Sequence, residues 1–225
     1  IPFDGQVRSV DGVKLMKDYL DRGRWSVDAR IKLICVIAAG MTTYEVRQTR
    51  EALELVQSEL ALGEKNHFSG PQMYQLLVAQ MDVIKEKSDP DTTSGIQSSW
   101  EQRLENSYQQ EVICDRILKL EGLTEEQRIR TRLRQAKVCA IYNPERACAL
   151  FLAALELPNL PYYFDTGSSI LHYLKEKNQR RQYFHLARVL CEKYSTAKDD
   201  ASKWQDTVED LACMLGKEQQ QSELD

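Results

Sequence analysis

Glycine and proline are scarce in this chain, which has 10 glycines and 6 prolines among its 225 residues. Sandwiches and barrels built only from β-strands use both residues freely at their turns. The sequence also lacks a sustained alternation of apolar and polar residues bounded by turn residues, which is the pattern of a half-buried strand. These absences argue against an all-β fold and predict helices.

The motifs of common enzyme classes are absent as well. The sequence contains no G-x-S-x-G, no phosphate-binding P-loop and no G-x-G-x-x-G. The histidines, His67, His172 and His185, show no metal-binding spacing. One catalytic alternative is a pair formed by Cys191 with His172 or His185, because these residues fall on adjacent predicted helices. We expect no catalytic residue, no metal site and no cofactor, and therefore no enzyme.

None of the six cysteines belongs to a C-x-x-C pair, the spacing that marks many zinc sites and redox motifs. Their neighbours are apolar, as in Leu33-Ile34-Cys35-Val36, so we expect buried and reduced thiols. Unpaired thiols in a protein core are typical of reducing compartments. The cysteines therefore predict a cytoplasmic or nuclear protein.

Neither a basic excess nor a long apolar run is present. The formal net charge is −4 and the sequence pI is about 5.6, whereas duplex-binding domains carry a basic excess that neutralises phosphates. No apolar run reaches the roughly 20 residues that cross a bilayer. We expect neither a nucleic-acid partner nor a membrane span. Because the chain begins with Ile1 and not with Met, we also expect a fragment or a processed chain.

Signals that begin and end helices recur along the chain. Gly23, Gly40 and Gly122 are placed to end helices, since glycine readily adopts the left-handed conformation there. The clearest starting signals are Thr42-Thr43-Tyr44-Glu45, Ser98-Ser99-Trp100-Glu101, Thr124-Glu125-Glu126-Gln127 and Asn143-Pro144. The predicted helices span about 11–22, 26–39, 42–62, 71–87, 98–120, 124–142, 144–157, 162–177, 179–194 and 200–215. Ten helices with short connections predict antiparallel hairpins.

One stretch interrupts this helical pattern. Residues 88–97 contain Pro90 and Gly95 among short polar residues, which favours a loop. The spacing of the acidic residues in this stretch does not match a calcium loop. We predict N-terminal helical hairpins over 1–87, a linker or long loop over 88–97, and further hairpins with a capping helix over 98–225. One continuous domain is the alternative.

A repeated pattern appears in the second half of the chain, where the sequence reads E-R-A-C-A-L-F-L-A-A-L-E-L-P-N. Small residues at Ala147 and Ala154 permit close helix approach, and Phe151 is large enough to fill the space between hairpins. The spacing of Phe151 and Ala154 returns 33 residues later at Phe184 and Ala187. A fixed period of this length is typical of helical repeats.

This pattern resembles the second helix of a tetratricopeptide repeat with its terminating Pro-Asn. The resemblance covers residues 124–195 as two repeats, and the hairpins over 26–62 and 71–120 count as degenerate members. It implies an all-α fold in which antiparallel hairpins stack as an α-α superhelix of about ten helices. It also implies a concave groove for a partner. Another helical repeat or a compact helical bundle is the alternative.

The most ordered charges lie on one predicted helix. Arg130, Arg134 and Lys137 stand at i, i+4 and i+7 and form a basic stripe, with Arg128 and Arg132 beside it. In a groove, such a stripe can hold an acidic peptide segment or a C-terminal carboxylate through bidentate contacts. The alternative is a solvated face that pairs with neighbouring carboxylates.

Tyr173 belongs to a group of aromatic residues at one predicted hairpin, together with Tyr162, Tyr163 and Phe164. Packing between repeats explains the group, and a peptide-anchoring pocket is the alternative because tyrosine is enriched at interface hot spots.

These patterns together predict a scaffold or adaptor that binds a partner peptide or helix. Two other functions remain open. One is a regulatory or signal-sensing helical-repeat module of a larger transcription regulator or ATPase. The other is an all-helical bacterial effector or enzyme with an unrecognised site.

Overall fold

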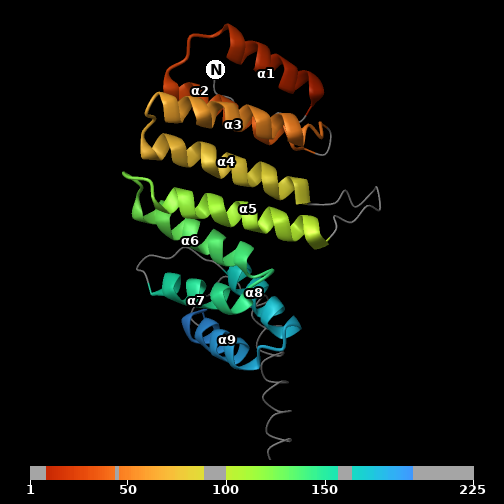
Figure 1. Ribbon diagram of the computed structural model, residues 1–225, viewed down its shortest axis with the longest axis vertical. Helices are drawn as coiled ribbons and strands as arrows, with labels where there is room; N and C mark the ends of the chain where they lie inside the picture. Colours follow the sequence, from red (N-terminus) through yellow and green to blue (C-terminus); the bar gives the residue numbers. More distant parts are fainter. Residues whose placement is uncertain (1–8, 44–45, 89–99, 157–163, 195–225) are drawn as a thin grey trace, which may run out of the picture. The chain divides into compact units, whose positions relative to one another are not determined.

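The computed structural model of the chain describes residues 9–43, 46–88, 100–156 and 164–194. Within these ranges the chain forms nine helices and no strand (Figure 1). The predicted all-α class is therefore confirmed. The tenth predicted helix, over 200–215, lies outside the described residues.

The helices belong to two compact units, Ile1–Thr131 and Arg132–Asp225. The helices are α1 (Val10–Arg22), α2 (Val27–Met41), α3 (Thr49–Lys65), α4 (Gly70–Ser88), α5 (Trp100–Leu118), α6 (Glu125–Cys139), α7 (Pro144–Leu155), α8 (Phe164–Glu176) and α9 (Arg180–Tyr194). The division between the units falls within α6. The predicted linker, apart from Ser88, lies outside the described residues, so the predicted domains stay a prediction.

In the N-terminal unit, each helix packs against the next one in the chain from α1 to α5, and α2 also packs against α4 (Figure 1). The core between them is aliphatic. Its fully buried side chains include Ile31, Ile34, Ile37, Met41, Leu76, Leu77 and Met81. Because α2 contacts both α3 and α4, it has more than one partner helix, which explains why so much of its surface is apolar.

A buried ion pair joins α2 to α3. Both Arg30 Nε and Arg30 Nη2 donate to the Glu59 carboxylate, at 2.9 Å to Oε1 and 3.0 Å to Oε2. Only 2% of Glu59 is exposed. A carboxylate is held in such a position only by a partner that satisfies its oxygens, so Arg30 fixes how these two helices meet.

Two of the predicted helix starts are confirmed in atomic detail. The Thr124 N–H donates to Gln127 Oε1 at 2.9 Å, and the Gln127 N–H donates to Thr124 Oγ1 at 3.2 Å, which is a reciprocal capping box. At α7, Asn143 Oδ1 accepts from the Arg146 N–H at 3.0 Å, and Pro144 occupies the first turn.

The predicted start at residues 42–45 is wrong. The hydroxyls of Thr42 and Thr43 donate backwards, to the carbonyl oxygens of Ala39 and Gly40 at 2.9 and 2.8 Å. They therefore satisfy the orphan carbonyls at the end of α2 and do not cap the start of α3. Helix α3 begins at Thr49, where no side chain caps it.

The glycines expected to end helices behave in three ways. Gly122 has φ +71°, so the predicted left-handed conformation is confirmed. Gly23 follows α1 in extended backbone with φ −87°, and the ring of Trp25 lies over it. Gly40 lies inside α2, which continues to Met41. The left-handed prediction is wrong at Gly23, because the chain leaves α1 extended and the absent side chain makes room for an indole.

In the C-terminal unit, α8 packs against α7 and α9, and α7 also contacts α9. The three residues singled out in the repeated pattern, Ala147, Phe151 and Ala154, are all buried on α7. A Cβ at Gly167 would lie 2.9 Å from Leu190 Cδ1 and 3.3 Å from Phe151 Cζ. Glycine therefore allows α8 to approach both neighbouring helices closely.

The second copy of the pattern differs by one residue. Ala187 is buried as expected, but Phe184 is only half-buried and the neighbouring Tyr183 is buried in its place. The buried face of α9 is therefore rotated relative to a strict repeat. Tyr183 supplies the aromatic bulk on that face.

Candidate functional site

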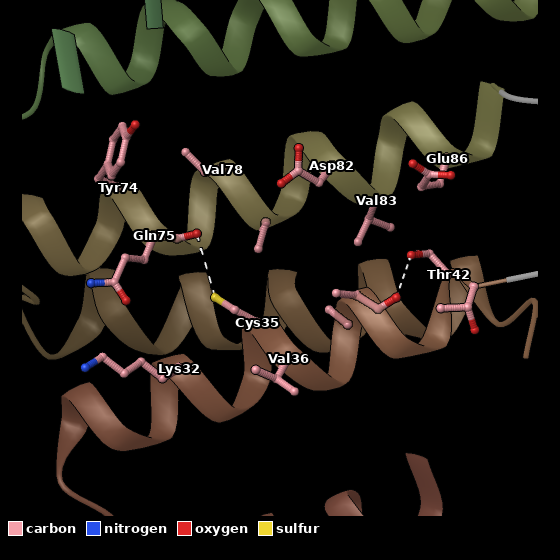
Figure 2. Close-up of a pocket in the computed structure, with 14 residues that line it drawn as sticks. Lys32, Cys35, Val36, Thr42, Tyr74, Gln75, Val78, Asp82, Val83 and Glu86 are labelled. Atoms are coloured by element: carbon pink, nitrogen blue, oxygen red, sulfur yellow. Dashed lines mark hydrogen bonds between the residues drawn. The ribbon is translucent and has the colours of Figure 1, made fainter. Parts of the chain in front are cut away.

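A groove of about 850 Å³ lies between α2 and α4 in the N-terminal unit (Figure 2). Its apolar walls are formed by Val36, Ala38, Ala39, Val78, Ala79 and Val83. Sites that bind ligands are mostly apolar hollows with a few polar groups, of roughly 300 to 1,000 Å³. The groove has the size and the lining of such a site.

The two walls of the groove repeat one spacing. On and just after α2, the groove residues stand at i, i+3, i+4, i+7 and i+11, and they are Lys32, Cys35, Val36, Ala39 and Thr43. The same intervals separate five groove residues of α4, which are Gln75, Val78, Ala79, Asp82 and Glu86. Residues at these intervals share one face of a helix. In Figure 2, residue numbers on both helices rise in the same direction along the groove, so the helices run parallel.

The ends of the groove differ in charge. Lys32 lies at one end together with Tyr74 and Gln75, whereas Asp82 and Glu86 lie toward the other (Figure 2). Lys32, Asp82 and Glu86 are all exposed. A bound molecule therefore meets one cation at the first end and two carboxylates at the second.

Cys35 lies at the floor of the groove, where its Sγ donates to the carbonyl oxygen of Gln75 over 3.8 Å (Figure 2). Burial, and to a smaller extent the negative charge of Asp82, raise the pKa of Cys35 from 9.0 to about 11. Burial also raises the pKa of Cys148 to about 11. Both thiols are protonated at neutral pH, which removes the thiolate that a cysteine nucleophile requires.

We expect the alkylation of Cys35 by iodoacetamide to be slow and strongly pH-dependent. At pH 9 an ordinary thiol is half ionised, whereas a pKa of about 11 leaves about 1% thiolate, so the rate should fall roughly 50-fold. Mass spectrometry of the Cys35 peptide measures this rate from pH 7 to 10. Asp82→Asn should raise it by less than tenfold, because burial has the larger effect. An alkylation rate that saturates near pH 9 would contradict a pKa of about 11 for Cys35.

The basic stripe occupies an exposed part of α6. Arg130 pairs with Glu126 one turn earlier, Arg134 is half-buried and Lys137 is exposed. All three remain on the same helix, as predicted, but none of them lines the groove. The stripe and the groove are therefore separate surfaces.

Arg128 and Tyr173 have local contacts. Arg128 Nη1 and Nη2 donate to the carbonyl oxygens of Leu118 and Leu120, both at 3.1 Å. This guanidinium therefore satisfies the carbonyls where α5 ends. Tyr173 is half-buried, with its ring 5.4 Å from the ring of His172. Of the other residues of the predicted group, Tyr162 and Tyr163 lie outside the described residues, and the side chain of Phe164 is not described either.

The structure describes the two histidines of the alternative catalytic pair, but not the side chain of its cysteine. His172 and His185 are exposed on α8 and α9, and neither lines the groove. His172 Nε2 lies 3.3 Å from Glu176 Oε1 on the same helix. The side chain of Cys191 is not among those that the structure describes. Across the described parts of the chain, no three His, Cys, Asp or Glu side chains are grouped to bind a metal ion. No helix there is long and apolar enough to cross a membrane.

Comparisons of the chain with protein-family models, with curated proteins and with solved structures found no match. The resemblance to tetratricopeptide repeats therefore rests on the sequence pattern alone and stays a prediction. The geometry of the groove is the evidence that bears on function.

The groove residues were not predicted from the sequence, although α2 carries a signal for them. Its core face follows Ile31, Ile34 and Ile37, whereas Val36 and Ala39 stand on a different side of the helix. A helix that is apolar on two sides has either two packing partners or an uncovered apolar face. Val36 is 40% exposed, so on that side the apolar face is partly uncovered.

Proposed function

We propose that the chain is a protein-interaction scaffold that binds a segment of a partner protein in the groove between α2 and α4. The uncovered apolar face of α2 beside α4 is the observation that carries this proposal. Exposed apolar surface set in a hollow and bordered by charged groups is typical of an interaction site. Val36, Ala39 and Ala79 would supply the apolar contact.

A helix is the segment that suits this groove best. Both walls present side chains at i, i+3, i+4 and i+7, so a third helix lying along the groove can interdigitate its own side chains with both rows. Small residues at Ala39 and Ala79 leave room for larger apolar side chains of the partner. This is the helix-in-groove mode, in which an amphipathic helix buries its apolar face.

Binding, and not catalysis, is the role that the groove chemistry supports. Among the described side chains that line the groove, the only thiol is that of Cys35, which is protonated at neutral pH because burial and the charge of Asp82 raise its pKa to about 11. None of the described lining residues is a histidine that could act as a base. We also propose a cytoplasmic or nuclear location, because Cys148 is a buried thiol that forms no disulfide with the part of the chain that the structure describes.

The basic stripe on α6 is a second candidate surface for a protein partner. Lys137 is exposed, and Arg130 is exposed beside Glu126. An acidic peptide segment that meets these cations remains our prediction for this surface. None of the stripe residues lines the groove, so variants of each surface, compared in one experiment, show which of the two binds the partner.

Val36→Asp should abolish partner binding at the groove. The aspartate places a hydrated charge on the apolar wall. A helix that binds there would have to remove the hydration water of this carboxylate, which is costly. We expect the wild-type chain to capture the partner from native lysate. The Val36→Asp chain should capture at least tenfold less of it. Quantitative mass spectrometry of the captured proteins measures the ratio.

Val27→Asp is the matched control. Val27 lies on the same helix, is 41% exposed against 40% for Val36, and does not line the groove. It should leave capture unchanged, and circular dichroism should show equal helix content in both variants. A variant with Arg130, Arg134 and Lys137 all changed to Glu is run in parallel. A partner lost only with this triple variant would place binding on α6 and overturn the groove proposal.

A further inference from the structure

We draw no further inference here: the strongest candidate, the row of exposed apolar side chains formed by Trp100, Tyr108 and Val112 along α5, carries none because nothing in the structure shows what covers it.

Discussion

Arg30→Ala should destabilise the N-terminal unit by about 2 to 4 kcal/mol. The substitution leaves the Glu59 carboxylate, which is 2% exposed, without the guanidinium that donates to both of its oxygens. Removal of one partner from a buried pair typically costs about 3 to 5 kcal/mol. We expect a loss about 1 kcal/mol smaller than that range because the Arg30 side chain is 38% exposed, so water reaches the pair. Urea denaturation followed by circular dichroism measures the loss.

The same substitution at Arg50 is the control for Arg30. Arg50 pairs with Glu54 one turn away on α3, and its side chain is 88% exposed. Exposed pairs contribute about 0 to 1 kcal/mol, so Arg50→Ala should have a small effect. Arg30→Met/Glu59→Leu should recover most of the stability, because apolar replacement removes both charges. Equal losses for Arg30→Ala and Arg50→Ala would show that Arg30 does not hold the buried carboxylate.

Gly70→Ala should destabilise the same unit by about 2 to 3 kcal/mol. A Cβ at Gly70 would lie 1.8 Å from the carbonyl oxygen of Glu121, which belongs to the backbone of the turn between α5 and α6. Backbone in a turn cannot rotate aside as a side chain does, so α4 and the turn have to separate. Overpacking of this kind typically costs about 1 to 3 kcal/mol.

Gly63→Ala is the comparison for Gly70→Ala. A Cβ at Gly63 would lie 2.8 Å from Met73 Sδ and 2.8 Å from Phe68 Cδ2, which are side-chain atoms and can shift. Alanine inside a helix also gains about 1 kcal/mol over glycine, which offsets part of that crowding. We expect Gly63→Ala to cost less than Gly70→Ala by at least 1 kcal/mol in the same urea titration. The reverse order would show that the contact between Gly70 and Glu121 does not limit packing.

Local signals explain why the helices were predictable from sequence. The capping box at Thr124 and Gln127 and the Asn143–Pro144 start depend only on residues within one turn, and both are confirmed. The threonines at 42 and 43 show the limit of such signals. A hydroxyl can satisfy the carbonyls of the helix before it as well as the amides of the helix after it, and sequence spacing alone does not decide between them.

The groove was not predictable by the same means, because it depends on the pairing of two helices that are not consecutive. Val36 and Ala39 line it only because α4 packs beside α2. The buried pair of Arg30 and Glu59 depends likewise on the meeting of α2 with α3. Charged residues on a helix are usually solvated, so nothing in the local sequence distinguishes Glu59 from its exposed neighbour Glu54.

Photo-cross-linking from position 36 tests the central proposal most directly. A photoreactive phenylalanine replaces Val36 in one sample and Val27 in another, and each chain is irradiated with the partner that the wild-type chain captures. We expect a covalent adduct to a single segment of the partner from position 36 and none from position 27. Adducts from position 27, with none from position 36, would contradict binding in the groove.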